Sequence, residues 1–161
     1  MIRHSYYQCF LFAFAVFMAS TTAAFTAPND AQKTLDTAGV RGGLVVHLGC
    51  GDGKLTAALK ANDSLMVHGL DADPANVAKA RQHVESLGLY GAVSVARLES
   101  LQLPYIDNLV NLIVVEDAGD VSNEEIMRVL SPGGVALFAE GGWKKVVKPR
   151  PDALDDWTHY L

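Results

Sequence analysis

A glycine-rich loop between a buried strand and a helix constrains this chain more than any other feature. Residues 44–48, LVVHL, are a short and mostly apolar run, typical of a strand that is buried on both faces of a parallel sheet. Residues 49–53, GCGDG, follow directly, and residues 54–61 carry apolar side chains at helical spacing. Glycines let a ligand approach the backbone closely, and the N-terminus of a helix favours anionic or polar ligand groups. The sequence therefore predicts a strand, loop and helix unit that binds a nucleotide or a carboxylate.

The spacing of the glycines limits which nucleotides the loop is expected to bind. Dinucleotide-binding loops have glycine at the first, third and sixth positions, but the sixth position counted from Gly49 is Lys54. The loop also lacks the Gly-Lys-Ser/Thr ending of a P-loop. NAD, FAD and ATP are therefore disfavoured as ligands.

Helices and strands are predicted to alternate through a domain over residues 28–142. Helices are expected near residues 28–39, 54–61, 74–87 and 123–130, and strands near residues 44–48, 65–70, 93–97, 109–115 and 135–139. This alternation predicts an α/β fold, a Rossmann-like doubly wound parallel sheet of about five strands. Residues 143–161 show no clear period. We therefore expect a linker or arm there, or the start of a further domain, and a sheet that is shortened at its C-terminal hairpin.

The G-x-G-x-G loop resembles motif I of the class I S-adenosylmethionine-dependent methyltransferases, which have a Rossmann-like fold. Asp71, at the end of the second predicted strand, matches the acidic residue that in this family accepts hydrogen bonds from both ribose hydroxyls. Glu99 matches the acidic residue after the third strand that accepts from the adenine amino group, and residues 130–134, LSPGG, resemble the turn before the fifth strand. The resemblance implies that S-adenosylmethionine is the cofactor, and that it is bound through Gly49, Gly51, Gly53, Asp71 and Glu99.

Two positions depart from the family pattern. His47 stands where motif I usually has an acid that orients the methionine end of the cofactor, and Asn111 stands where the fourth strand commonly has an aspartate. Glu116 and Asp117 are the carboxylates available as a base facing the methyl acceptor, which the sequence does not identify. Two functions stay open: a methyltransferase, or a non-catalytic nucleotide-binding or structural module of a larger exported protein.

The N-terminal residues are predicted to be a signal peptide. Arg3 and His4 precede an apolar run over residues 9–19, and small residues follow around 22–24, which is the layout of a secretory signal over residues 1–24. The apolar run is about half of the roughly 20 residues that a membrane span needs, so no stable span is expected after signal cleavage. We therefore expect an exported protein, periplasmic or extracellular.

The charged and metal-binding residue types exclude several partners. The chain has 13 Lys and Arg against 18 Asp and Glu, a net charge of −5 without runs of one sign, so nucleic acid is not expected as a partner. The histidines show no paired metal-ligand spacing, so no metal is expected. Cys50 is the only cysteine after the predicted signal, and we expect it to pack rather than to act as a nucleophile.

A second resemblance concerns the C-terminal residues. Residues 148–160, KPRPDALDDWTHY, resemble the junction after which some large exported bacterial proteins continue into a quinoprotein-like β-propeller. The resemblance implies that this chain is the N-terminal part of a longer protein with a fused β-propeller domain.

Overall fold

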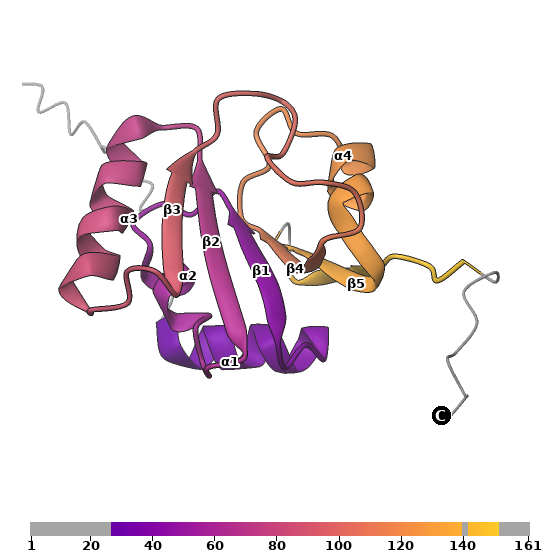
Figure 1. The fold of residues 1–161 in the computed structure, drawn as a ribbon, viewed down its shortest axis with the longest axis horizontal. Coiled ribbons are helices and arrows are strands. Elements are labelled where there is room, and N and C mark those ends of the chain that lie inside the picture. Colours follow the sequence, from indigo (N-terminus) through magenta and orange to yellow (C-terminus); the bar gives the residue numbers. More distant parts are fainter. Residues whose placement is uncertain (1–26, 140–141, 152–161) are drawn as a thin grey trace, which may run out of the picture.

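Strands and helices alternate along most of the chain, as the sequence predicts. The computed structural model describes residues 27–139 and 142–151, which form one sheet with helices packed on it (Figure 1). The helices are α1 (Ala27–Ala38), α2 (Lys54–Ala58), α3 (Pro74–Ser86) and α4 (Asn123–Val129). The strands are β1 (Gly43–Leu48), β2 (Leu65–Asp71), β3 (Val93–Arg97), β4 (Val110–Val115), β5 (Leu130–Phe138) and β6 (Lys144–Val147).

The order of the strands places a topological switch point at β1. The sheet runs β3-β2-β1-β4-β5-β6, with parallel pairing from β3 to β5 and an antiparallel pair between β5 and β6. The chain moves outward from β1 to β3 and then returns to the other side of β1 with β4. Ligands of open α/β sheets bind at the carboxyl ends of the strands where the order reverses in this way. The glycine loop leaves β1 at that place.

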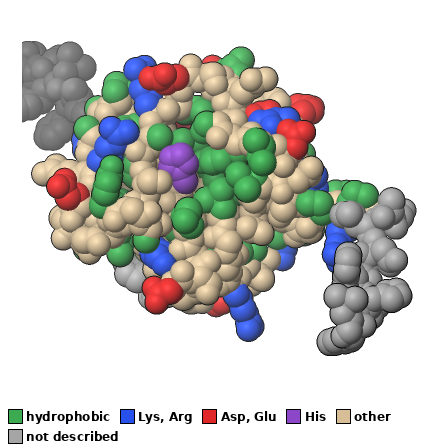
Figure 2. Space-filling view, in the orientation of Figure 1, with side chains coloured by type: hydrophobic (Ala, Val, Ile, Leu, Met, Phe, Trp, Pro, Cys, Tyr) green, Lys and Arg blue, Asp and Glu red, His purple; other side chains and the backbone are tan. Residues whose placement is uncertain are grey.

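The two faces of the sheet are covered differently. Val45 on β1 belongs to an apolar cluster with α1, α2 and α3, whereas Val46 belongs to a second cluster with α4. The connection between β3 and β4 contains no helix, and the second face is open over part of β2. Figure 2 shows hydrophobic side chains around a histidine on this face, and Met66 of β2 is 59% exposed. The sheet is doubly wound, as predicted, but in the described part of the chain α4 is the only helix on its second face, and residues of the connection such as Leu103 pack beside it.

The connection over residues 98–109 is fastened to the sheet and to α4 by polar contacts. The backbone N–H of Leu103 donates to the Glu125 carboxylate at 2.7 Å, and Arg128 donates to the carbonyl oxygens of Leu103 and Tyr105. The Tyr105 hydroxyl lies 2.7 Å from Nδ1 of His68, and burial lowers the pKa of His68, which favours a neutral ring that accepts this bond. These contacts hold residues 103–105 on β2 and α4, and the N–H of Leu98, which donates to the carbonyl oxygen of Asp71 at 2.9 Å, holds the start of the connection beside the end of β2.

The C-terminal part of the sheet corrects several sequence predictions. Residues 144–147 are not part of a linker or arm but form β6, so the sheet has a sixth strand and the expected domain boundary at residue 142 lies too early. Lys145 of β6 donates to the carbonyl oxygens of Thr37 and Ala38 at the end of α1. Leu130 does not continue the preceding helix but begins β5, where it pairs with Val110. Residues 130–134, expected to form a turn, lie within β5, with a register shift in its pairing with β4.

Several predictions concern residues that the structure does not describe. The expected signal peptide over residues 1–24 and most of the expected propeller junction lie outside the described residues. Within residues 27–139 and 142–151, no helix is both long and apolar enough to cross a bilayer.

Candidate functional site

The three positions of the loop require glycine for different structural reasons. All three have positive φ angles, +77° at Gly49, +52° at Gly51 and +79° at Gly53. A Cβ on Gly49 would lie 2.6 Å from the backbone nitrogen of Asp117, and a Cβ on Gly53 would lie 2.7 Å from Cβ of Ala80 on α3. A Cβ on Gly51 would have no atom within 4 Å. Gly49 and Gly53 therefore allow close packing, whereas Gly51 supplies the left-handed turn on the open side of the loop.

Asp71 joins the glycine loop to the end of β2. Its side chain is nearly buried, and its Oδ2 accepts from the backbone N–H of Gly51 at 2.9 Å. Its Oδ1 accepts from the N–H of Asp73 at 2.9 Å, and the Asn76 amide lies 3.3 Å from both oxygens. An ionised carboxylate has about four acceptor positions. The two short bonds take one position on each oxygen and the longer Asn76 contacts take the second, so a pair of ribose hydroxyls can be accepted once the Asn76 amide turns away.

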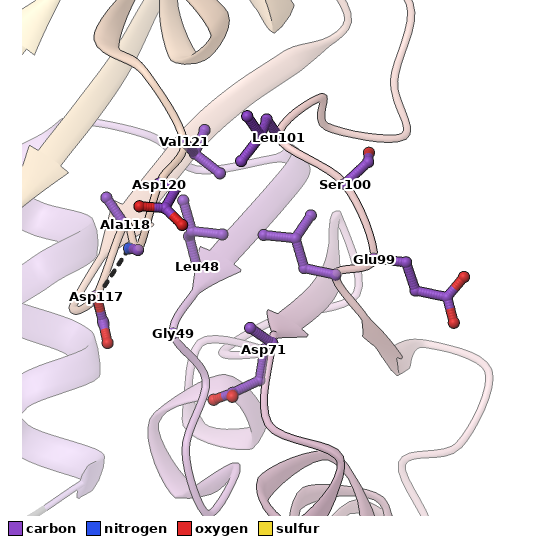
Figure 3. Close-up of a pocket in the computed structure, with 13 residues that line it drawn as sticks. Leu48, Gly49, Asp71, Glu99, Ser100, Leu101, Asp117, Ala118, Asp120 and Val121 are labelled. Carbon is purple, nitrogen blue, oxygen red and sulfur yellow. Dashed lines mark hydrogen bonds between the residues drawn. The ribbon is translucent and has the colours of Figure 1, made fainter.

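A cavity of about 310 Å³ opens at the switch point, between the carboxyl ends of β1 and β2, residues 98–101 and residues 117–121 (Figure 3). We call it the acidic cavity, because four carboxylates and no Lys, Arg or His line it: Asp71, Glu99, Asp117 and Asp120. Of the five predicted cofactor-binding residues, Gly49, Asp71 and Glu99 line this cavity, whereas Gly51 and Gly53 are not among its lining residues. A cavity of this charge suits a ligand that carries positive charge.

Glu99 lies in the wall of the acidic cavity with its side chain turned outward. The residue is exposed, and in Figure 3 its carboxylate points away from Asp71 and the glycine loop. Its predicted bond to an adenine amino group would therefore require a rotation of the side chain.

His47 lies beneath the glycine loop and is fully buried. Its Nδ1 is 2.8 Å from the Thr56 hydroxyl on α2, and its Nε2 is 3.2 Å from Oε2 of Glu116 at the end of β4. A neutral imidazole satisfies both contacts if Thr56 donates to Nδ1 and Nε2–H donates to Glu116. Sequence reasoning missed this pair, because the pairing of β1 with β4 brings together two residues that are 69 positions apart.

A second cavity of about 430 Å³ adjoins the acidic cavity, since Asp117 and Ala118 line both. Its other lining residues combine apolar side chains, such as Met127 and Phe138, with Glu116, Asn123 and Lys144. We call it the adjoining cavity. Lys144 could not be foreseen as a site residue, because the strand that carries it was not predicted.

The remaining candidate residues lie outside this chemistry. Burial, together with the nearby Asp71 carboxylate, raises the pKa of Cys50 to about 12, so the thiol stays protonated and packs, as expected. Asn111 accepts from the backbone N–H of Leu44, toward the opposite end of the sheet from the glycine loop. Among the described residues, no group of three His, Cys, Asp or Glu side chains could hold a metal ion.

The strand order, the glycine loop at the switch point and the acid at the end of β2 together define a class I S-adenosylmethionine-dependent methyltransferase domain. The family described as a methyltransferase domain matches residues 45–134. This match covers more than half of the chain, which therefore belongs to that family.

Individual relatives are distant. The ubiquinone/menaquinone biosynthesis C-methyltransferase UbiE of Klebsiella pneumoniae is 28% identical over 137 residues, which cover 80% of this chain and 54% of the relative. A SAM-dependent methyltransferase structure from Aquifex aeolicus is 26% identical, with a TM-score of 0.60 over 68% of this chain and 62% of that one. The cyclase SpnF shares the fold, with a TM-score of 0.61 and 23% identity over 69% of this chain and 43% of that one. The chain thus spans about half the length of the UbiE relative that it matches.

Proposed function

We propose that this chain binds S-adenosylmethionine in the acidic cavity and transfers its methyl group to an acceptor held in the adjoining cavity. The observation that carries the proposal is the nearly buried Asp71, which binds the glycine loop and whose two oxygens can accept from two hydroxyls in place of the longer Asn76 contacts. The charge of the cavity agrees with it, because the sulfonium and the ammonium of the cofactor outweigh its single carboxylate. When bound, the cofactor supplies an electrophilic methyl group.

The residues of the chain contribute mainly positioning. Asp71 holds the ribose hydroxyls, and Gly49, which lines the acidic cavity, leaves the end of β1 without a side chain there. Leu98 and Leu101 add apolar surface to the wall of the acidic cavity, which suits a purine ring. Methyl transfer is an in-line displacement, so correct placement of the acceptor supplies much of the rate enhancement.

The adjoining cavity favours an acceptor with an apolar body. Met127 and Phe138 are two of its apolar lining residues, and Glu116, Asn123 and Lys144 supply polar groups beside them. Asp117 lines both cavities and is therefore the carboxylate nearest to the path between cofactor and acceptor. We assign to Asp117 the reception of a proton where the acceptor has to lose one.

Calorimetric titration of the full chain with S-adenosylmethionine, S-adenosylhomocysteine and NAD tests the proposal. We expect micromolar binding of the first two ligands and no binding of NAD. Transfer of a radiolabelled methyl group to small-molecule fractions of a cell extract then identifies the acceptor. A folded protein that binds neither of the first two ligands would refute the proposal and favour a structural module.

We also propose that the protein is exported and that it continues into a β-propeller. The support is the secretory layout of residues 1–24 and the resemblance of residues 148–160 to a propeller junction. Cell fractionation and N-terminal sequencing of the mature protein test export; processing near residue 24 is the expected result, and an intact N-terminus in the cytosol would contradict it. Export would separate the domain from the cytosol, where S-adenosylmethionine is made, so an exported protein that binds the cofactor without transferring methyl groups would be a nucleotide-binding module.

A further inference from the structure

Glu116 is a partly exposed carboxylate that contacts a buried imidazole. Its side chain is 31% exposed, whereas His47, which contacts one of its oxygens at 3.2 Å, has no exposed surface. Thr56, on the other side of the imidazole, is also fully buried. The three side chains therefore form a chain of hydrogen bonds that runs from α2 through β1 to the end of β4.

This chain of bonds fixes the orientation of Glu116. Because Thr56 and His47 are enclosed, neither can exchange its partner for water, and every polar atom of the imidazole is used. One oxygen of Glu116 is bound by His47, and the exposed part of the carboxylate faces outward. A surface carboxylate without such an anchor would sample several rotamers. Glu116 is thus prepared to bind a group that arrives from solvent.

The register of the strands places Glu116 beside the glycine loop. Val115 pairs with Leu48, and the backbone N–H of Glu116 donates to the carbonyl oxygen of Leu48 at 3.0 Å. Asp71 ends β2 on one side of β1, and Glu116 follows β4 on the other. Two carboxylates therefore flank the loop, separated by about two strand spacings, or roughly 10 Å. The adjoining cavity, which Glu116 lines, meets the acidic cavity at Asp117 and Ala118.

A ligand with its ribose on Asp71 can extend across the loop toward Glu116. In the proposed cofactor, the amino-acid end is joined to the ribose through the sulfur and a short flexible chain, which spans this separation when extended. We infer that Glu116, positioned by His47, is the carboxylate that receives the ammonium group at the amino-acid end of the cofactor. The inference rests on the proposed function. It explains how a histidine is accommodated at position 47: the carboxylate that this end of the cofactor requires comes from the neighbouring strand.

Three ligands separate this role from others. S-adenosylmethionine and S-adenosylhomocysteine carry the amino-acid end, whereas 5′-methylthioadenosine has the same nucleoside and sulfur without it. In the full chain, Glu116→Gln should weaken binding of the first two roughly tenfold, which corresponds to about 1.4 kcal/mol, and leave 5′-methylthioadenosine unchanged. Glu124→Gln makes the same charge change at an exposed residue in the first turn of α4 and should alter none of the three affinities.

His47 is a positioning residue that acts through Glu116, and separate variants test this role. His47→Asn keeps an amide donor but is too short to reach both partners, so it should reproduce the selective loss for the two amino-acid ligands. In the double variant His47→Asp with Glu116→Gln, the carboxylate moves back to β1, and recovery of most of the lost affinity is expected. Thermal unfolding of each variant establishes that it is folded.

The outcomes distinguish this inference from the proposed function. Equal losses for all three ligands, or no loss for any, in a folded Glu116→Gln variant would overturn the inference while the wild-type chain still binds the cofactor. A loss of methyl transfer with all affinities intact would also overturn it, because Glu116 would then serve the acceptor. Failure of the wild-type chain to bind any of the ligands would overturn the proposed function itself.

Discussion

Replacement of Asp71 by asparagine separates its two roles, in the loop and in the site. The two short bonds go to different oxygens, Gly51 N–H to Oδ2 and Asp73 N–H to Oδ1, each at 2.9 Å. An asparagine amide has one accepting oxygen, so whichever way it turns, one of the two backbone N–H groups faces another donor. A nearly buried donor without a partner costs about 1–3 kcal/mol, and we expect the free energy of unfolding of Asp71→Asn to fall by that amount.

The effect on the cofactor follows from the same geometry. Asparagine offers one neutral accepting oxygen, so one ribose hydroxyl loses its acceptor and the other loses a charged one, and a hydrogen bond to a charged group contributes about 1.5–3 kcal/mol. The dissociation constant for S-adenosylmethionine should therefore rise roughly tenfold to a hundredfold. Asp73→Asn is the matched control: it makes the same charge change two residues away, and asparagine caps a helix as well as aspartate does, so α3 should keep its cap.

Calorimetric titration and denaturant unfolding of the two variants give both quantities. A fall in the unfolding free energy of Asp71→Asn, with cofactor affinity within about twofold of wild type, would refute the reasoning on ribose binding. Asp71 would then be a residue that only holds the loop.

Other substitutions and conditions test separate parts of the structure. In a Cys9→Ser background, Cys50 should react with a thiol reagent at pH 8 only after unfolding. Burial raises the pKa of the Cys50 thiol to about 12 in the folded state. The contribution of this thiol to the free energy of unfolding should therefore be complete below pH 9 and decline as the pH rises from 9 toward 12. Gly53→Ala should lower the free energy of unfolding by more than about 2 kcal/mol, because the added methyl group would clash with α3 and the residue has a positive φ. Gly51→Ala also has a positive φ but open space around it, so it should lower the free energy of unfolding by only about 1 kcal/mol. Denaturant titrations of the two variants compare these values. Arg128→Ala should expose the connection over residues 98–109 to limited proteolysis, and a cleavage rate equal to wild type would show that the arginine does not fasten this connection.

The part of the fold that the sequence predicts is the part where one face or both faces of an element are buried. β1 and β4 are continuous apolar runs because both of their faces are covered, and α3 begins where Asp73 accepts from the N–H of Ala75, ahead of a proline at the first helical position. Local patterns of this kind reflect local causes, so their boundaries agree with the structure to within a residue or two.

The parts that the sequence did not predict depend on distant contacts. β6 is a short edge strand with two lysines, and such strands carry little apolar signal because charge protects an exposed edge. Leu130 has the spacing of a helical residue, but pairing with β4 draws it into β5. The contact of His47 with Glu116 depends on strand register, and the outward orientation of Glu99 depends on a connection without regular structure. The binding roles of the five predicted cofactor residues stay predictions, with Asp71 the one whose geometry supports its role most directly.

The reversed direction of β6 has a consequence for how this domain can be joined to others. Phe138 and Lys144 pair near the carboxyl ends of the parallel strands, where the cavities lie. Val135 and Val147 pair further toward the amino ends, where the N–H of Lys148 donates to the carbonyl oxygen of Gly134. The backbone that passes through Lys148 is therefore travelling away from the ligand entrance. An attachment made after Lys148, such as a partner domain, a label or a solid support, therefore starts at the end of the sheet opposite the cavities. Ligand binding and attachment can then use opposite ends of the domain.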